Sequence, residues 1–209
     1  MFLPVPLKIA RPQPTRRSII AAFAGLAAGA GWGKFAVAQP AIEGLPDAAD
    51  ALTQIMPQAA PPVVFHNPAG KRLTLADYRG QALVVNLWAT WCGPCVEELP
   101  SFAAIAPILR PHGVLILPIS IDIGGAADVR PFFASHHIRS LPVLLDPNGN
   151  NMGVLGTNAI PYSIIINAAG KMVATMDGAA DWNTPRTIAY LEALGSASAP
   201  GREARFTPV

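Results

Sequence analysis

The sequence predicts an α/β sandwich with a mixed central β-sheet flanked by helices. Residues 82–90 and 113–121 are continuous apolar, β-branched runs, which are typical of strands buried on both faces. A helical pattern lies between them, so this part is expected to form a parallel β-α-β unit. Residues 161–167 and 172–177 are two further strand-like runs separated by a short turn, which predicts an antiparallel hairpin. A parallel unit followed by a hairpin requires a mixed sheet.

An added β-hairpin is expected ahead of the first buried strand. Residues 63–78 contain two short strand-like runs on either side of the Asn-Pro-Ala-Gly turn at 67–70. The helix after the first buried strand begins near Pro94, which suits an early helical position because it lacks an N–H. The apolar face of that helix follows helical spacing and consists of Leu99, Phe102, Ile105 and Leu109.

The later elements alternate between helices and strands. We expect a helix at 126–137, a strand at 142–146 and a short helical piece near 152–155. After the second hairpin, a last helix has Thr184 as its N-cap and Pro185 at its first position.

Residues 1–38 have the layout of a secretory signal. They carry five basic residues and no acidic one, an apolar run at 19–33, and the sequence Ala-Val-Ala at 36–38, which matches an A-x-A cleavage site. The stretch TRRSII at 15–20 also resembles a twin-arginine export motif. The apolar run is shorter than the ~20 residues of a membrane-spanning helix, so we expect a cleaved signal rather than a retained anchor. Export points to the periplasm, where disulfides can persist.

The remaining chain divides into a linker at 39–61 rich in Pro and Ala, one domain at 62–195, and a flexible tail at 196–209. Beyond residue 38 there are 10 basic and 13 acidic residues, a net charge of −3. A mildly acidic body without a basic cluster argues against nucleic acid as a partner. Because the sequence shows no exposed apolar stripe, a monomer is expected.

The only two cysteines of the chain, Cys92 and Cys95, lie two residues apart in the stretch WCGPC. A C-x-x-C pair that follows a buried strand and opens a helix places the first sulfur over the helix N-terminus. Unpaired N–H groups and the positive end of the dipole there favour the thiolate, so the pKa of Cys92 is expected to fall below the ~8.5 of a free cysteine. Cys95, one turn further, is expected to resolve a mixed disulfide formed on Cys92.

Other roles for the pair fit less well. An inert structural disulfide across so short a loop would remove little entropy from the unfolded chain. A lone C-x-x-C is a poor zinc site, and the four histidines have no ligand spacing to it, so no resident metal is predicted. Transient copper binding stays open, and with it a copper-handling assembly factor as an alternative function.

The stretch VVNLWATWCGPC resembles the active loop of the thioredoxin superfamily. The extension CVEELP, the export signal and the added hairpin are similar to the branch of periplasmic thiol-disulfide oxidoreductases exemplified by TlpA and ResA. The resemblance covers roughly residues 62–195 and implies a thioredoxin-like fold with no cofactor beyond a redox-active disulfide. It also implies that Trp91, Gly93 and Pro94 contact the substrate. Pro161 matches the cis-proline of the family, which would let Ile160 present its backbone to a substrate chain.

Asn86 departs from the superfamily pattern. In cytosolic thioredoxins this strand position holds a buried Asp that moves protons to and from the resolving cysteine, and an amide cannot titrate. Glu98 follows Cys95 at i+3, so we expect it to accept the proton instead, with a raised pKa if it is partly buried. Glu97 is interpreted as a surface residue.

The function expected from this resemblance is reduction of protein disulfides in the periplasm. Electrons would come from a membrane thiol transporter, and the clients would be cysteines that are reduced before haem attachment or copper insertion, as in cytochrome c or oxidase maturation. A thiol peroxidase of the same fold is the enzymatic alternative. It would need a Pro at the position of Val85, so the dithiol reading is favoured.

Overall fold

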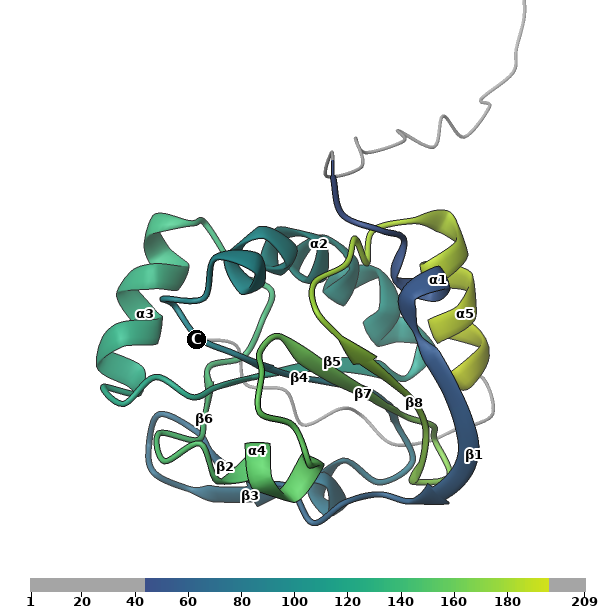
Figure 1. The fold of residues 1–209 in the computed structure, drawn as a ribbon, viewed down its shortest axis with the longest axis horizontal. Coiled ribbons are helices and arrows are strands. Elements are labelled where there is room, and N and C mark those ends of the chain that lie inside the picture. Colours follow the sequence, from purple (N-terminus) through teal and green to yellow (C-terminus); the bar gives the residue numbers. More distant parts are fainter. Residues whose placement is uncertain (1–43, 196–209) are drawn as a thin grey trace, which may run out of the picture. The chain divides into compact units, whose positions relative to one another are not determined.

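A computed structural model describes residues 44–195, and the predicted signal sequence and C-terminal tail lie outside this range. Within it, one eight-stranded mixed sheet has the order β1-β8-β7-β4-β5-β6-β2-β3. Helices α2, α3 and α5 cover one face of the sheet, and the short helix α4 lies on the other (Figure 1).

The centre of the sheet is formed by β4 (Ala82–Trp88) and β5 (Val114–Ser120), in which every residue is buried. They pair in parallel, with Trp88 opposite Ser120, while the other edge of β4 pairs antiparallel with β7 (Tyr162–Ile166). β7 continues into β8 (Lys171–Asp177) as an antiparallel hairpin. The predicted combination of a parallel unit and a later hairpin is therefore confirmed.

Alternate residues of β4 enter two separate hydrophobic clusters. Ala82, Val84 and Trp88 face α2, α3 and α5, whereas Leu83, Val85 and Leu87 face the opposite layer. This alternation follows from the two-residue period of a strand. The same period turns the side chain of Asn86 toward α2, where it is fully buried.

The remaining strands are short. β2 (Val64–His66) and β3 (Arg72–Thr74) form an antiparallel pair, and β6 (Leu144–Leu145) joins β2 to β5. The strand expected at 142–146 thus pairs over two residues only.

One predicted boundary is wrong. The range 39–61 was expected to be a linker, but its described part holds α1 (Ala48–Ala51) and β1 (Thr53–Ala59), and β1 pairs antiparallel with β8 at the edge of the sheet. Most residues of β1 are exposed, and Pro57 lies inside the strand. An edge strand tolerates proline and lacks the alternating apolar residues of a half-buried strand, so its sequence resembles a linker.

The helices follow the expected positions closely. α2 spans Gly93–Leu109, α3 Ala126–Ser135, α4 Asn150–Leu155 and α5 Pro185–Gly195, with single turns of 3-10 helix at Leu75–Tyr78 and Arg110–His112. The N-cap prediction for α5 is confirmed, because the N–H of Thr187 donates to Thr184 Oγ1 over 3.1 Å. Among residues 44–195, the structure has no helix that is both long and apolar enough to cross a membrane.

Candidate redox site

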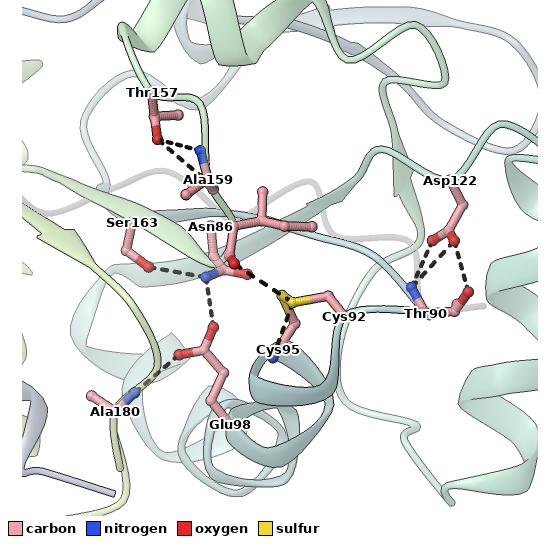
Figure 2. The surroundings of a disulfide bond; sticks show 11 residues. Asn86, Thr90, Cys92, Cys95, Glu98, Asp122, Thr157, Ala159, Ser163 and Ala180 are labelled. Carbon is pink, nitrogen blue, oxygen red and sulfur yellow. Dashed lines mark hydrogen bonds between the residues drawn. A yellow bond between two sulfur atoms is a disulfide. The ribbon is translucent and has the colours of Figure 1, made fainter.

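The two cysteines lie where β4 ends and α2 begins. Cys92 is the N-cap residue of α2, and the N–H of Cys95 donates to Cys92 Sγ over 3.3 Å. The two sulfurs form a disulfide, with the Cα atoms 5.3 Å apart (Figure 2). Because the backbone N–H groups of a helix start converge on Cys92, a thiolate released there by reduction is stabilised by them and by the helix dipole.

The surroundings of the two sulfurs are unequal. Cys92 is 7% exposed and borders Trp91, whose side chain is 68% exposed, whereas Cys95 is fully buried. Gly93 and Pro94 are exposed as well, so the loop around Cys92 is open to a partner. Of the two cysteines, only Cys92 keeps exposed surface beside this open loop.

The segment before β7 lies across from Cys92. The Ile160–Pro161 peptide bond is cis, as the resemblance implies, and the carbonyl oxygen of Ile160 is 3.7 Å from Cys92 Sγ. Pro161 is buried and Ile160 half-buried. The backbone of Ile160 is thus beside the sulfur that a substrate chain would approach.

Glu98 lies on α2 one turn after Cys95, and both side chains are buried. Its carboxylate accepts three hydrogen bonds. Oε1 accepts from Asn86 Nδ2 over 2.9 Å, and Oε2 accepts from the N–H of Ala180 over 3.3 Å and from Trp182 Nε1 over 3.2 Å (Figure 2 shows the first two). The side chain is thereby held in one orientation behind the dithiol.

Burial raises the pKa of Glu98 from 4.5 to about 7, although all three hydrogen bonds act in the opposite direction. The free energy needed to remove the ionised carboxylate from water exceeds the stabilisation that the three hydrogen bonds give it. A carboxyl group that changes its charge near neutral pH is suited to proton transfer. Glu97, the neighbouring acid, is exposed.

Asn86 connects Glu98 with β7. Its Nδ2 also donates to Ser163 Oγ over 3.0 Å, and all three side chains are fully buried. Its Oδ1 is buried without a hydrogen-bond partner among the described residues. Asn86 Nδ2 thus links the carboxylate of Glu98 on α2 to Ser163 on β7.

Sequence reasoning assigned no role to the loop that encloses Glu98 from the other side. Trp182 stacks on Phe102 of α2 with ring centroids 4.8 Å apart, and the backbone N–H of Trp182 donates to Ser101 Oγ over 3.1 Å. The same loop is tied to the N-terminal segment, because the N–H of Ala48 donates to the carbonyl of Asp181 over 3.0 Å. No local motif marks this role, since the contacts join residues more than 80 positions apart.

Trp182→Phe tests the hydrogen bond to Glu98 directly. Phenylalanine keeps an aromatic ring beside Phe102 but loses the donor, which is the largest influence lowering the pKa of Glu98. We expect that pKa to rise above about 7. Because hydrogen bonds to charged groups contribute about 1.5–3 kcal/mol, we also expect a loss of about 2 kcal/mol of stability at alkaline pH and a smaller loss at acid pH. NMR titration of the Glu98 carboxyl and urea unfolding at both pH values measure the two effects, and an unchanged pKa would contradict the assignment.

Metal ligands do not gather near the dithiol. Among residues 44–195, no group of three or more His, Cys, Asp or Glu side chains could hold a metal ion. His112 instead lies 3.3 Å from Glu192, and His136 stacks on Phe132 with ring centroids 3.9 Å apart.

Comparisons with known proteins identify the family of this chain. Residues 56–175 match the model of the AhpC/TSA family. The chain belongs to that family. Over 119 residues it is 30% identical to "Thiol-disulfide oxidoreductase ResA" of Bacillus thuringiensis subsp. konkukian, covering 57% of this chain and 68% of the relative. This family member is a thiol-disulfide oxidoreductase whose redox centre is the Cys92–Cys95 pair.

Solved structures show the same fold. A thiol:disulfide interchange protein of the thioredoxin family from Chlorobium tepidum superposes with a TM-score of 0.53 at 24% identity, covering 67% of this chain and 99% of its own. StoA from Bacillus subtilis superposes with a TM-score of 0.50 at 21% identity, covering 65% and 98%. The predicted thioredoxin-like sandwich is confirmed.

Proposed function

We propose that this oxidoreductase reduces disulfide bonds of client proteins in the periplasm. The observation that carries the proposal is the unequal pair of sulfurs. Cys92 lies at the helix start beside an exposed tryptophan, and Cys95 is fully buried one turn before Glu98, a carboxyl group whose pKa is raised to about 7. This arrangement supports a two-step exchange that starts at Cys92 and finishes at Cys95.

The reaction begins with the dithiol form. The Cys92 thiolate attacks one sulfur of a client disulfide, which forms a mixed disulfide and releases the other client sulfur as a thiolate. Cys95, once deprotonated, attacks Cys92 Sγ, and the second client sulfur leaves. Two electrons pass to the client, the Cys92–Cys95 disulfide forms, and the client ends with two thiols after taking up protons.

Glu98 supplies the proton acceptor for Cys95 in this proposal. Side chains three residues apart on a helix have Cβ atoms about 5–6 Å apart, so a proton can pass directly or through one water. An acceptor that is half ionised near neutral pH both takes the proton from Cys95 and returns it in the reverse reaction. Asn86 holds the carboxylate in place, with 2.9 Å between Nδ2 and Oε1.

The substrate is proposed to bind over the exposed loop and the segment before β7. Trp91, Gly93 and Pro94 offer an open surface around Cys92, and the backbone of Ile160 lies beside its sulfur. Pro161 contributes no N–H, so the segment presents the Ile160 carbonyl without a competing donor at the next residue.

The layout of residues 1–38 supports export to the periplasm, and the resemblance supports a membrane thiol donor and clients in cytochrome c or oxidase copper-site maturation.

The direction of electron flow distinguishes a reductase from an oxidase, so the proposal is tested by the redox state of the cysteine pair in cells. In cells whose thiols are trapped by acid quenching and alkylation, we expect Cys92 and Cys95 to be held mainly as the dithiol, and the purified dithiol form to reduce insulin. A pair that is fully oxidised in cells and fails to reduce insulin would contradict the reductase role.

A further inference from the structure

A buried carboxylate lies beside the active loop, outside the machinery described above. Asp122 follows β5 and is 2% exposed. Because β4 and β5 run in parallel with Trp88 opposite Ser120, the residues that follow them meet at the same edge of the sheet. Asp122 therefore contacts Thr90, which is two residues before Cys92.

Asp122 accepts hydrogen bonds from both neighbouring segments (Figure 2 shows those from Thr90). Thr90 donates its N–H to Oδ2 over 3.0 Å and to Oδ1 over 3.2 Å, and its hydroxyl to Oδ1 over 2.7 Å. Ser120 Oγ donates to Oδ2 over 2.7 Å. In all four hydrogen bonds the carboxylate of Asp122 is the acceptor, and an ionised carboxylate can only accept. Neither of the two ion pairs found in residues 44–195 includes Asp122.

We propose that Asp122 is a positioning residue that fixes the chain before Cys92 and, as a buried anion without a cationic partner, makes the dithiol a stronger reductant. The disulfide form carries no charge, whereas the reduced form carries the Cys92 thiolate at pH values above its pKa. A fixed negative charge nearby raises the free energy of that thiolate. It therefore shifts the equilibrium between dithiol and disulfide toward the disulfide, so that the protein gives up its electrons more readily.

The distance is short enough for this effect. Two Cα–Cα steps of about 3.8 Å separate Thr90 from Cys92, so the carboxylate bound to the N–H of Thr90 lies within roughly 12 Å of the Cys92 Cα atom. At that separation and an effective dielectric constant of about 20, two unit charges interact strongly enough to change an equilibrium constant by about tenfold.

Other titratable groups on the elements beside Cys92 are Glu97 and Glu98 on α2, and Asp128 and Arg130 on α3. Of these only Glu98 is buried, and it lies beyond Cys95 along the helix. Asp128 provides a matched control, because it is an exposed acid in the first turn of α3, close in sequence to Asp122. Its Oδ2 also accepts a backbone hydrogen bond, from the N–H of Gly124 over 3.0 Å.

The test compares wild type with Asp122→Asn and Asp128→Asn. Each oxidised protein is equilibrated with glutathione, where two glutathione thiols reduce the protein disulfide and form one glutathione disulfide. Above the pKa of Cys92, we expect Asp122→Asn to raise the equilibrium constant for reduction about tenfold, and in a Cys95→Ser background to lower the pKa of Cys92. Below that pKa the difference in equilibrium constant disappears, because the reduced form is then a neutral thiol. Asp128→Asn is expected to match wild type.

Three results would overturn the proposal: no change in Asp122→Asn, an equal change in Asp128→Asn, or a change that persists at low pH, which would indicate distortion rather than charge. If Asp122→Asn does not fold, Ser120→Ala answers the same question, because it keeps the carboxylate and removes one donor. Because the Ser120 hydroxyl then no longer offsets part of the negative charge, the pKa of Cys92 should rise above its wild-type value, and an unchanged or lower pKa would contradict the proposal. The inference rests on the proposed reductant role, but its test uses no client, so failure of client reduction by the wild type is a separate result.

Discussion

Cys92→Ser is expected to reduce the turnover of protein disulfides to the uncatalysed background, whereas Cys95→Ser retains the first step and stops at the mixed disulfide. The reason is the difference in access to the two sulfurs, since Cys92 borders an exposed loop and Cys95 is fully buried. Insulin reduction by the purified variants measures the first effect. Covalent adducts on non-reducing gels measure the second.

The same pair of variants identifies clients. Expressed as the full chain in the native host, the Cys95→Ser protein should be recovered in disulfide-linked complexes, and the Cys92→Ser protein should not. Because the chain has only two cysteines, each variant carries a single thiol and the assignment is unambiguous. Equal adduct formation by both variants would show that the order of attack is not set by burial.

Glu98→Gln should slow the resolving step by about 10²-fold near neutral pH, the lower end of the range for general base catalysis. Glutamine keeps the size of the side chain but cannot accept a proton. We expect the rate of Cys95 attack on a preformed mixed disulfide to lose the dependence on a group with a pKa of about 7. Glu97→Gln is the matched control, because it makes the same change at the adjacent, exposed position. A wild-type pH profile in Glu98→Gln would remove Glu98 from the mechanism.

The same substitution has a consequence for stability. The pKa of Glu98 is raised from 4.5 to about 7 in the folded protein, so the folded state binds a proton that the unfolded state releases between these values. Stability from this group is fully present below pH 4.5 and is lost as pH rises through about 7. At 1.36 kcal/mol per unit of pKa the loss is about 3 kcal/mol. Urea unfolding from pH 4 to pH 8 should show this decline in wild type and not in Glu98→Gln.

Local sequence was sufficient for the elements whose pattern reflects their own burial. β4 and β5 are buried on both faces, so an unbroken apolar run identified them, and the cysteine spacing at a strand-to-helix junction identified the redox pair. Local sequence was insufficient for β1, because an exposed edge strand has no alternation of apolar and polar residues. Local sequence also suggested Glu98 as the replacement acid without indicating what holds it, because the donors come from two other segments, Asn86 from β4 and Ala180 and Trp182 from the loop after β8.

The sequence by itself determined the fold class, the dithiol and the position of a candidate acid, because each depends on residues close together along the chain. Only the tertiary structure decided the electrostatics of the site. Burial raises the pKa of Glu98 against the hydrogen bonds from the loop of Trp182, and the parallel register of β4 and β5 brings Asp122 to Thr90. A charge is stabilised or destabilised by whatever packs around it, and in this protein those neighbours are up to 84 residues away.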